Sequence, residues 1–426
     1  MKYTQNEKLM QIKNETLVVG VDIGSETHYA RAFDYRGIEL GRLVIFENSA
    51  EGFAKFDRWL EENTRLHGKT EAIVGMEPTG HYWFSLGFHL LEGQAKIALV
   101  NPFHVKRTKE LDDNSPTKND RKDPKTIAML VKDGRYLEPY IPEGVYRELR
   151  VAMEVYDRHI KRLTEINNKV RRWLHIYFPE FVQVFKDWRG KAALLTLKSF
   201  PTPQKVLETG LEGIVDCWKT EIKRAIGFKH AIRLQEAAKR SIGVKEGLRA
   251  ATSEIQMLLE EYEMVSRQME TNMELVKELL IQVPNVQAVL AIKGIGVVAV
   301  ARFIASVGEI KRFAHPRQIQ KLAGMNLKEN SSGKHKGKTT LSKRGRRDLR
   351  RGLFQAVMPL VAKNPEFREL HKYYTTREKN PLTRMQSLMA LCCKLIRIFY
   401  ALLTKGTTYD PQKMLSDIRR PEMLVA

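Results

Sequence analysis

The chain is poor in cysteine and has no long apolar run. Its 426 residues include only three cysteines, Cys217, Cys392 and Cys393, and their spacing suits neither a disulfide framework nor a zinc site. No apolar stretch approaches the ~20 residues of a membrane helix, and the first residues lack a hydrophobic signal segment. These absences exclude the disulfide-rich secreted class, predict no membrane span and favour the reducing cytoplasm.

Acidic residues are also scarce relative to basic ones. The chain has 50 Asp and Glu against 72 Lys and Arg, a net charge of +22. Such an excess is typical of proteins that bind nucleic acid, with an anionic membrane as the second candidate. The excess is concentrated between Val283 and Leu360, where sixteen basic residues face three acids. Nucleic acid is therefore the expected partner.

The first ~140 residues alternate strand-like and helix-like patterns. A hairpin is expected to turn at Arg36 and Gly37, so the region should open with a three-strand meander. The patterns predict a mixed α/β sheet. Strands are expected at 17–24, 28–46 (the hairpin), 71–78 and 95–102, and helices at 52–66 and 81–93.

Four acidic residues stand out in this α/β region. Asp22 and Glu77 each end an apolar run of the kind that forms a buried strand. Asp120 and Asp123 follow, and Pro124 after them fits only the first turn of a helix. The pair should thus lie near a helix N-terminus, where the helix dipole favours ionised carboxylates.

Converging carboxylates need a partner, and the commonest is a hard divalent cation. The order of the four acids matches an RNase H-like nuclease core, in which two metal ions hold the attacking and leaving oxygens of a phosphodiester. Singly, each acid is explained as well by a helix cap or a turn. Only the four in this order favour a metal site.

Two long helices with heptad seams are predicted between ~145 and ~282. Each seam contains one Asn, and two arrangements are open: an antiparallel hairpin within one chain, or a coiled-coil arm that dimerises. The segment ~185–250 is predicted to be helical as well, with a break at 200–203. The seam residues are Tyr156, Ile160, Leu163, Asn167, Val170, Leu174 and Tyr177 in the first helix, and Ile255, Leu258, Tyr262, Val265, Met269, Asn272, Val276 and Leu279 in the second.

The basic region begins with a helix–hairpin–helix pattern. Gly294 and Gly296 would let the backbone approach a phosphate closely, although an ordinary helical turn explains the same residues. After ~365, one more amphipathic helix is expected, with a stripe of Leu382, Met385, Met389, Cys392, Ile396 and Phe399.

A serine-bearing basic segment follows the hairpin pattern. Ser331, Ser332 and Gly333 are predicted to lie in a flexible loop, which is either a solvated basic loop or the carrier of a serine nucleophile for a DNA phosphate. No His motif lies nearby, so metal coordination would have to activate the hydroxyl. The candidate nucleic-acid contacts are Lys293, Gly294, Gly296, Lys334, Lys336, Lys338, Lys343, Arg344, Arg346, Arg347 and Arg350.

Four motifs resemble one protein family. They are VGVDIGSETH, EPTGHYW, NDRKD, and a final block of KGIG, QIQKLAGMN, SSG and LSKRGRRDLRR. Together they resemble the DEDD transposases of one class of bacterial and archaeal insertion sequences and the Piv-type DNA invertases. The motifs lie in the expected order and cover about half the chain. Two departures are Pro124, where the family usually has Ala, and Ser331, a second hydroxyl beside Ser332.

The sequence patterns and the resemblance together predict a domain order. A RuvC-like (RNase H-fold) domain would span 1–144, a helical coiled-coil assembly region 145–282, an α-helical serine-bearing transposase domain 283–365 and a helical tail 366–426. The implied tetrad is Asp22, Glu77, Asp120 and Asp123, holding Mg2+ with Mn2+ as the alternative ion. The implied nucleophile is Ser332.

The resemblance also implies a reaction and partners. Members are thought to cut and rejoin double-stranded DNA through a 5′-phosphoserine linkage, with the tetrad of one subunit beside the serine of another. Several are guided by a structured bridge RNA, and a homodimer or tetramer is expected. Two rivals stay open: a RuvC-like structure-specific endonuclease that uses metal-activated water, and a non-enzymatic basic nucleic-acid-binding protein.

Overall fold

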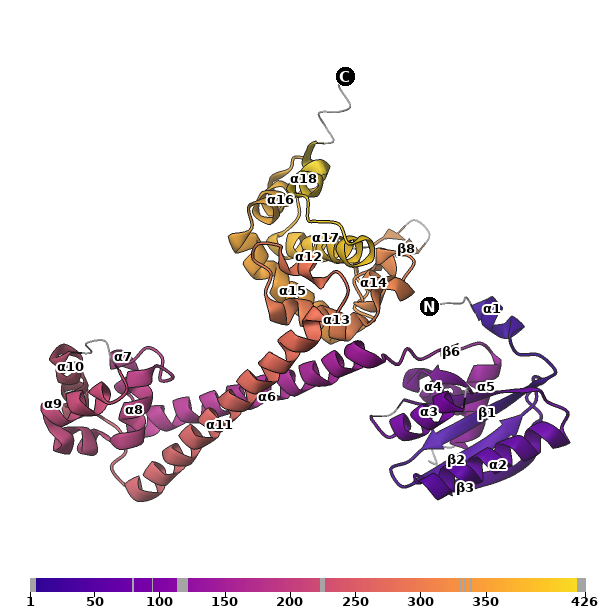
Figure 1. Ribbon diagram of the computed structural model, residues 1–426, viewed down its shortest axis with the longest axis horizontal. Coiled ribbons are helices and arrows are strands. Elements are labelled where there is room, and N and C mark those ends of the chain that lie inside the picture. The colour runs from indigo at the N-terminus through magenta and orange to yellow at the C-terminus, as the bar shows by residue number, and fades with distance from the viewer. Residues whose placement is uncertain are drawn as a thin grey trace. The chain divides into compact units, whose positions relative to one another are not determined.

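The computed structural model describes residues 5–78, 80–93, 95–112, 122–222, 227–328, 331–332, 335–337 and 339–419. The chain divides into two compact units, 1–141 and 142–426. The first is an α/β unit and the second is almost entirely helical (Figure 1). The first unit ends at residue 141, three residues before the boundary at 144 that was expected from the sequence. The three regions expected after it, 145–282, 283–365 and 366–426, lie together in the second unit.

The N-terminal unit is built on a six-stranded mixed sheet of order β3-β2-β1-β4-β5-β6. Strands β1, β4 and β5 are parallel, and the other pairs are antiparallel. The predicted meander and mixed sheet are confirmed, while the short strand β6 was not predicted. The strands are β1 (Thr16–Ile23), β2 (Thr27–Phe33), β3 (Glu39–Glu47), β4 (Glu71–Met76), β5 (Lys96–Val100) and β6 (Tyr136–Leu137).

Helices cover both faces of this sheet (Figure 1). Helices α2 and α3 pack on the face that carries Val19, Val21 and Met76. Helix α5 packs on the opposite face, against Val18 and Ile73. The bounds are α1 (Gln5–Met10), α2 (Ala50–Leu66), α3 (Trp83–Glu92), α4 (Pro102–Asp112) and α5 (Asp123–Lys132).

The predicted hairpin turn between β2 and β3 is confirmed. Gly37 has φ +95°, a conformation that glycine adopts without steric cost. The carboxylate of Asp34 accepts hydrogen bonds from the backbone N–H groups of Arg36 and Ile38. Burial raises the pKa of Asp34, but these bonds and the Arg36 guanidinium outweigh it and the pKa is lowered overall.

Gly20 lets α5 approach the sheet closely. A Cβ atom on Gly20 would lie 1.9 Å from the carbonyl oxygen of Pro124 and 2.7 Å from the amide nitrogen of Ala128. Both obstacles are backbone atoms, so no side-chain rotation relieves the overlap. The glycine therefore sets the height of the first turn of α5 above β1.

Replacing Gly20 with Ala is expected to destabilise the chain by about 1–3 kcal/mol, because α5 must move away from β1. Chemical denaturation followed by circular dichroism measures the effect. Gly93→Ala is the matched control in the same unit, since a Cβ there lies 3.7 Å from its nearest neighbours at φ −77°. Equal stability of the two variants would contradict the assigned packing.

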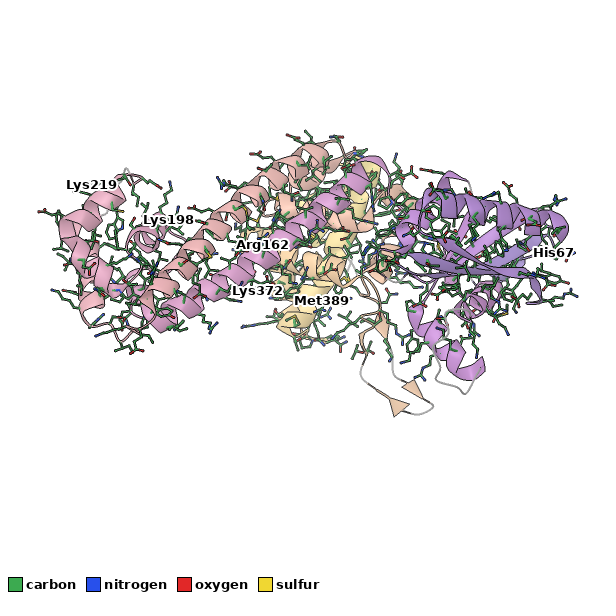
Figure 2. All side chains as sticks on the ribbon, turned by 90° about the horizontal axis from the view of Figure 1, so that it is seen from below. His67, Arg162, Lys198, Lys219, Lys372 and Met389 are labelled. Carbon is green, nitrogen blue, oxygen red and sulfur yellow. The ribbon has the colours of Figure 1, made fainter. Side chains whose placement is uncertain are left out.

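The second unit contains two long helices, α6 (Gly144–Tyr177) and α11 (Leu248–Ile281). They pack antiparallel: Asn272 donates to the carbonyl of Ala152, and Trp173 donates to the carbonyl of Ala251. Arg162, labelled in Figure 2, pairs with Glu261 midway along. The hairpin within one chain is thus present. Dimerisation through these helices stays a prediction.

The ends of the two helices join two separate cores. One is a small bundle whose helices include the predicted break, since α8 ends at Ser199 and Pro203 begins α9. The seam residue Asn167 accepts a hydrogen bond from Trp188 of this bundle. The bundle consists of α7 (Phe181–Val184), α8 (Lys191–Ser199), α9 (Pro203–Lys219) and α10 (Phe228–Lys239).

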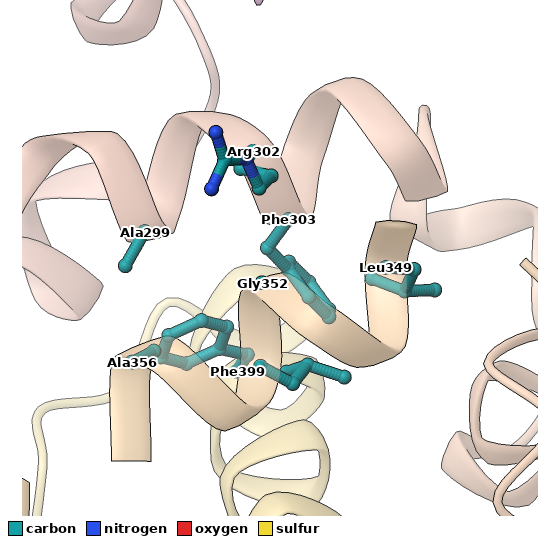
Figure 3. A pocket seen from close by; sticks show the side chains of 8 residues that line it. Ala299, Arg302, Phe303, Leu349, Gly352, Ala356 and Phe399 are labelled. Carbon is teal, nitrogen blue, oxygen red and sulfur yellow. The ribbon is translucent and has the colours of Figure 1, made fainter. Parts of the chain in front are cut away.

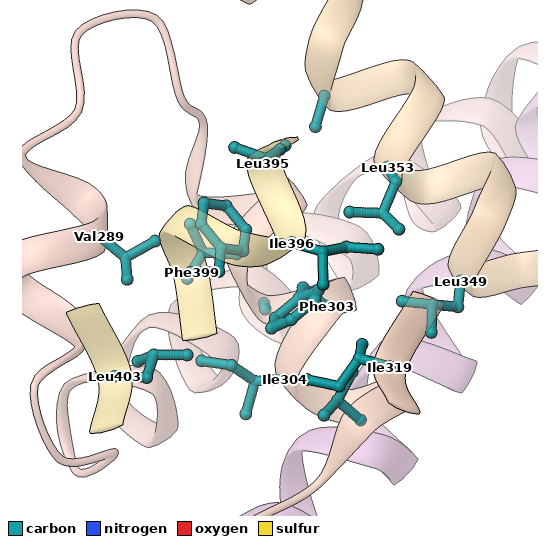
Figure 4. Packing of buried hydrophobic residues seen from close by; sticks show 14 of the residues in the cluster. Val289, Phe303, Ile304, Ile319, Leu349, Leu353, Leu395, Ile396, Phe399 and Leu403 are labelled. Atoms are coloured by element: carbon teal, nitrogen blue, oxygen red, sulfur yellow. The ribbon is translucent and has the colours of Figure 1, made fainter. Parts of the chain in front are cut away.

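The other core unites the rest of the second unit (Figure 4). Phe303, Leu349 and Phe399 come from three different helices and pack together. The core crosses residue 365, where the sequence suggested a separate tail. Its elements are α12 (Val286–Leu290), α13 (Val297–Val307), a 3-10 turn (Ile310–Arg312), α14 (Pro316–Leu322), α15 (Arg347–Lys363), α16 (Pro365–Thr376), α17 (Arg384–Lys405) and α18 (Pro411–Arg419).

Helix α17 is long and apolar enough to cross a bilayer by length and composition, which corrects the expectation that no apolar stretch reaches that length. In the structure Leu395, Ile396 and Phe399 are buried in the core of the second unit, as expected for a core helix. The predicted stripe is right for Cys392, whose thiol pKa is raised by burial. It is wrong for Met385, which is exposed.

Candidate active site

Two predicted acids lie on adjacent parallel strands. The register of β1 and β4 pairs Val21 with Met76, so Asp22 and Glu77 follow at the next step of each strand. Neighbouring strands are about 4.8 Å apart. The backbone thus brings Asp22 and Glu77 together at the carboxyl-end edge of the sheet, and both side chains are half-buried.

The third described acid reaches the same edge from α5. Asp123 is the first residue of that helix, Pro124 is in its first turn as predicted, and the Asp123 side chain is largely buried. The carbonyl of Pro124 lies over Gly20, two residues before Asp22. Alternation along β1 places Asp22 on the same sheet face as Gly20. The carboxyl ends of β1 and β4 and the N-terminus of α5 therefore lie at the same edge of the sheet.

The carboxylate of Asp123 has a cation partner that the sequence did not suggest. Lys109 of α4 forms an ion pair with it. Within the described ranges, no three His, Cys, Asp or Glu side chains are grouped closely enough to hold a metal ion. Asp120 lies outside these ranges. The convergence of the tetrad into one metal site therefore stays a prediction.

His28 supports the turn that follows Asp22. Its Nδ1 accepts a hydrogen bond of 3.3 Å from the backbone N–H of Gly24. The imidazole is fully buried beside the rings of Phe46 and Phe53. Burial lowers the pKa of His28, which keeps the ring neutral and able to accept this bond.

Glu71 stands at the opposite end of β4 from Glu77. Its carboxylate accepts hydrogen bonds from Lys96 at 2.5 Å and Thr16 at 2.7 Å. The bond from Lys96, followed by that from Thr16, lowers the pKa of Glu71. This acid ties three strands together and belongs to the structure of the sheet.

The candidate serines form a short hairpin, which corrects the prediction of a flexible loop. Strand β8 (Ser331–Ser332) pairs antiparallel with β9 (His335–Lys336), and β7 (Leu327–Lys328) pairs with β10 (Thr340–Leu341). The register sets Ser332 opposite His335. This histidine was not among the predicted site residues, although it lies only three positions after Ser332 in the sequence.

Two helices joined by a glycine turn are present, which fits both the helix–hairpin–helix pattern and the ordinary helical turn that the sequence left open. Helices α12 and α13 flank Gly294, which has φ +93°, and Gly296 caps α13. The carbonyl of Lys293 accepts a hydrogen bond from Asn364, which anchors the turn to the end of α15. Among the residues that the structure describes, a Cβ on Gly296 would meet no atom within 4 Å.

The predicted basic contacts fall into three groups. Arg346 and Arg350 donate to backbone carbonyls of Ser306 and Ala323, so they brace the loop before α15. Lys336 lies in β9, while Lys334 and Lys338 lie outside the described residues. The exposed cations are Lys293, Lys343, Arg344 and Arg347.

A small hollow between α13 and α15 is no candidate site (Figure 3). Arg302 is the only charged residue that lines it. Its guanidinium donates to Gln355 and pairs with Asp157 of α6. These contacts join three helices, which explains the residue without any ligand.

Comparison with known proteins assigns the chain to a class. Residues 19–179 match a DEDD transposase family of the IS110 type, and residues 286–372 match the transposase IS116/IS110/IS902 family. The first match covers most of the α/β unit and all of α6, and the second runs from α12 into α16 and includes the serine hairpin. They define a DNA transposase. The chain belongs to the DEDD-type transposases of insertion sequences.

Relatives agree with this assignment. A 44.8 kDa protein of insertion element IS116 from Streptomyces clavuligerus is 20% identical over 406 residues, 94% of this chain and 98% of its own length. The transposase for insertion sequence element IS1111A from Coxiella burnetii is 24% identical, over 73% of this chain and 72% of its own length. A 42 kDa protein of insertion element IS900 from Mycobacterium paratuberculosis is 21% identical, over 52% of this chain and 55% of its own length.

Proposed function

We propose that this transposase cuts and rejoins DNA through a serine–phosphate bond, formed beside a Mg2+-holding carboxylate site of the RNase H-like (RuvC-like) type. The observation that carries the proposal is the shared sheet edge, where the β1–β4 register sets Asp22 beside Glu77 and α5 begins at Asp123. The meander followed by parallel strands supports this fold, because it gathers acid-bearing strand ends at one edge.

The residues fit a hard cation. Asp22, Glu77, Asp120 and Asp123 offer only oxygen donors, which suit Mg2+, with Mn2+ as the alternative. The bound ion would supply Lewis-acid polarisation of the scissile phosphate and the attacking hydroxyl. The ammonium group of Lys109 competes with any such ion for Asp123, since it already pairs with that carboxylate.

In the proposed step the Oγ atom of Ser332 attacks the phosphorus atom. A Ser–O–P bond forms, the bond from phosphorus to the 3′ oxygen breaks, and the hydroxyl proton passes to that leaving oxygen. The phosphoserine keeps the phosphodiester's bond energy, so a new 3′-hydroxyl can reverse the step without ATP. The exposed cations Lys343, Arg344 and Arg347 would neutralise phosphate charge nearby.

The same proposal includes the partners. Double-stranded DNA at the element ends and target would meet the basic second unit, and a structured bridge RNA would supply sequence recognition. A homodimer or tetramer would form through α6 and α11, which is supported by the 40% exposure of the seam residue Ile160. The protein would carry out this reaction in the cytoplasm.

The test is to trap the full chain on element-end DNA with Mg2+ and the transcribed flanking RNA. Nuclease digestion and mass spectrometry then locate any nucleotide-modified residue. A 5′-phosphorylated nucleotide on Ser332 is expected. Cleavage without any adduct would instead favour the RuvC-like endonuclease. DNA binding without cleavage in any metal would favour a non-enzymatic nucleic-acid-binding protein.

A further inference from the structure

The carboxyl-end edge of the sheet carries exposed aromatic side chains as well as acids. Tyr82, Phe84 and Phe103 are 40%, 37% and 63% exposed, and we call these three the aromatic rim. Tyr82 caps α3 and Phe103 is the second residue of α4. These helices begin after β4 and β5, which are parallel and in register from Ile73 to Met76. The rim therefore follows the same edge as Asp22 and Glu77.

The aromatic rim is not needed for the hydrophobic core. In α3, Trp83 and Leu86 face the core, and in α4 Val105 does so. Isolated exposed apolar residues are common on protein surfaces, but here three aromatic rings follow one edge of a sheet. The carboxyl ends of parallel strands are where α/β proteins bind ligands. Exposure at this edge thus indicates a binding surface.

Positive charge accompanies the rings. The guanidinium carbon of Arg107 lies 5.6 Å from the centroid of the Phe103 ring. Lys106 and Arg107 are exposed, and the segment 102–109 contains three cations and no acid. Aromatic rings beside cations that can follow a phosphate backbone are the features of single-strand binding surfaces.

We propose that the aromatic rim stacks on unpaired bases of the DNA strand that enters the carboxylate edge. The faces of the bases are covered by stacking within a duplex, so the aromatic rim selects unpaired DNA over duplex DNA. Lys106 and Arg107 contact the phosphates of the unpaired strand. The inference rests on the proposed function for the identity of the strand. It adds that the strand is unpaired next to the scissile phosphate.

Photo-crosslinking of the full chain to a 5-iodouracil oligonucleotide tests the inference. Trypsin would release Phe103 in the peptide 97–106 and Tyr82 with Phe84 in 70–96. We expect crosslinks in these peptides at least about fivefold above those with the matching duplex, as follows from the energy of base–aromatic stacking. The internal control is Tyr35 in peptide 32–36, since it is 41% exposed and Arg36 also lies 5.6 Å from its ring centroid.

Variants separate this inference from the proposed function. Phe103→Ala should abolish crosslinking to peptide 97–106 and lower cleavage of element-end DNA severalfold, and Phe103→Trp should restore both. Tyr35→Ala should change neither. Equal crosslinking to duplex, or to the Tyr35 peptide, would overturn the inference, as would coverage of the rim by a second copy of the chain that blocks it. Failure of the proposed function would appear differently: crosslinks at the rim with no serine adduct.

Discussion

Asp22→Asn is expected to lower DNA cleavage by about a thousandfold or more while DNA binding is kept. The substitution keeps the size of the side chain but removes a negative charge that a bridging Mg2+ ligand needs. A thousandfold loss corresponds to about 4 kcal/mol of transition-state stabilisation. Cleavage of labelled element-end DNA and binding by filter retention measure the two properties separately.

The matched control for this substitution is Glu71→Gln. Glu71 lies at the other end of β4 and bonds to Lys96 and Thr16, so its loss should cost at most about 1 kcal/mol of stability. Cleavage by that variant should stay near the wild-type level. If Asp22→Asn cut DNA within tenfold of the wild-type rate, the carboxylate edge would not be the active site.

Strands β1, β4 and β5 could be predicted because each contains an apolar run. Strand β1 contains the run Leu-Val-Val-Gly-Val because both faces of the strand are buried, and this run has no helical periodicity. The two-residue strand β6 escaped prediction, because Tyr136 and Leu137 are too few to form a pattern. The edge that holds Asp22 and Glu77 follows from strand order, which sequence periodicity alone leaves open.

Contacts between distant segments could not be predicted. Lys109 reaches Asp123 only because α4 and α5 pack together, and nothing in the local sequence of either helix encodes that pairing. Met385 was expected to be buried by its spacing, but the first turn of α17 extends past the core. The stripe is buried from Cys392 onward, at Cys392, Ile396 and Phe399.

The hairpin that carries the candidate serines also could not be predicted from the local sequence. Its apolar content is low, so periodicity predicted a loop, whereas strand pairing depends on the partner strand. Once paired, Ser331 and Ser332 occupy different register positions, opposite Lys336 and His335. The hairpin therefore gives the two serines different backbone partners, although the sequence leaves the choice between them open.

Ser332→Ala is accordingly expected to abolish both the covalent adduct and strand joining, whereas Ser331→Ala should keep both within a fewfold of wild type. Alanine removes the hydroxyl and fits either strand position, so DNA binding should be unchanged. Denaturing gels of the chain on labelled DNA measure the adduct. The proposed function assigns the attack to Ser332, which has a different backbone partner from Ser331. If Ser331→Ala removed the adduct and Ser332→Ala kept it, the nucleophile would lie one position earlier in the chain. If both variants kept it, the covalent step would belong to another residue.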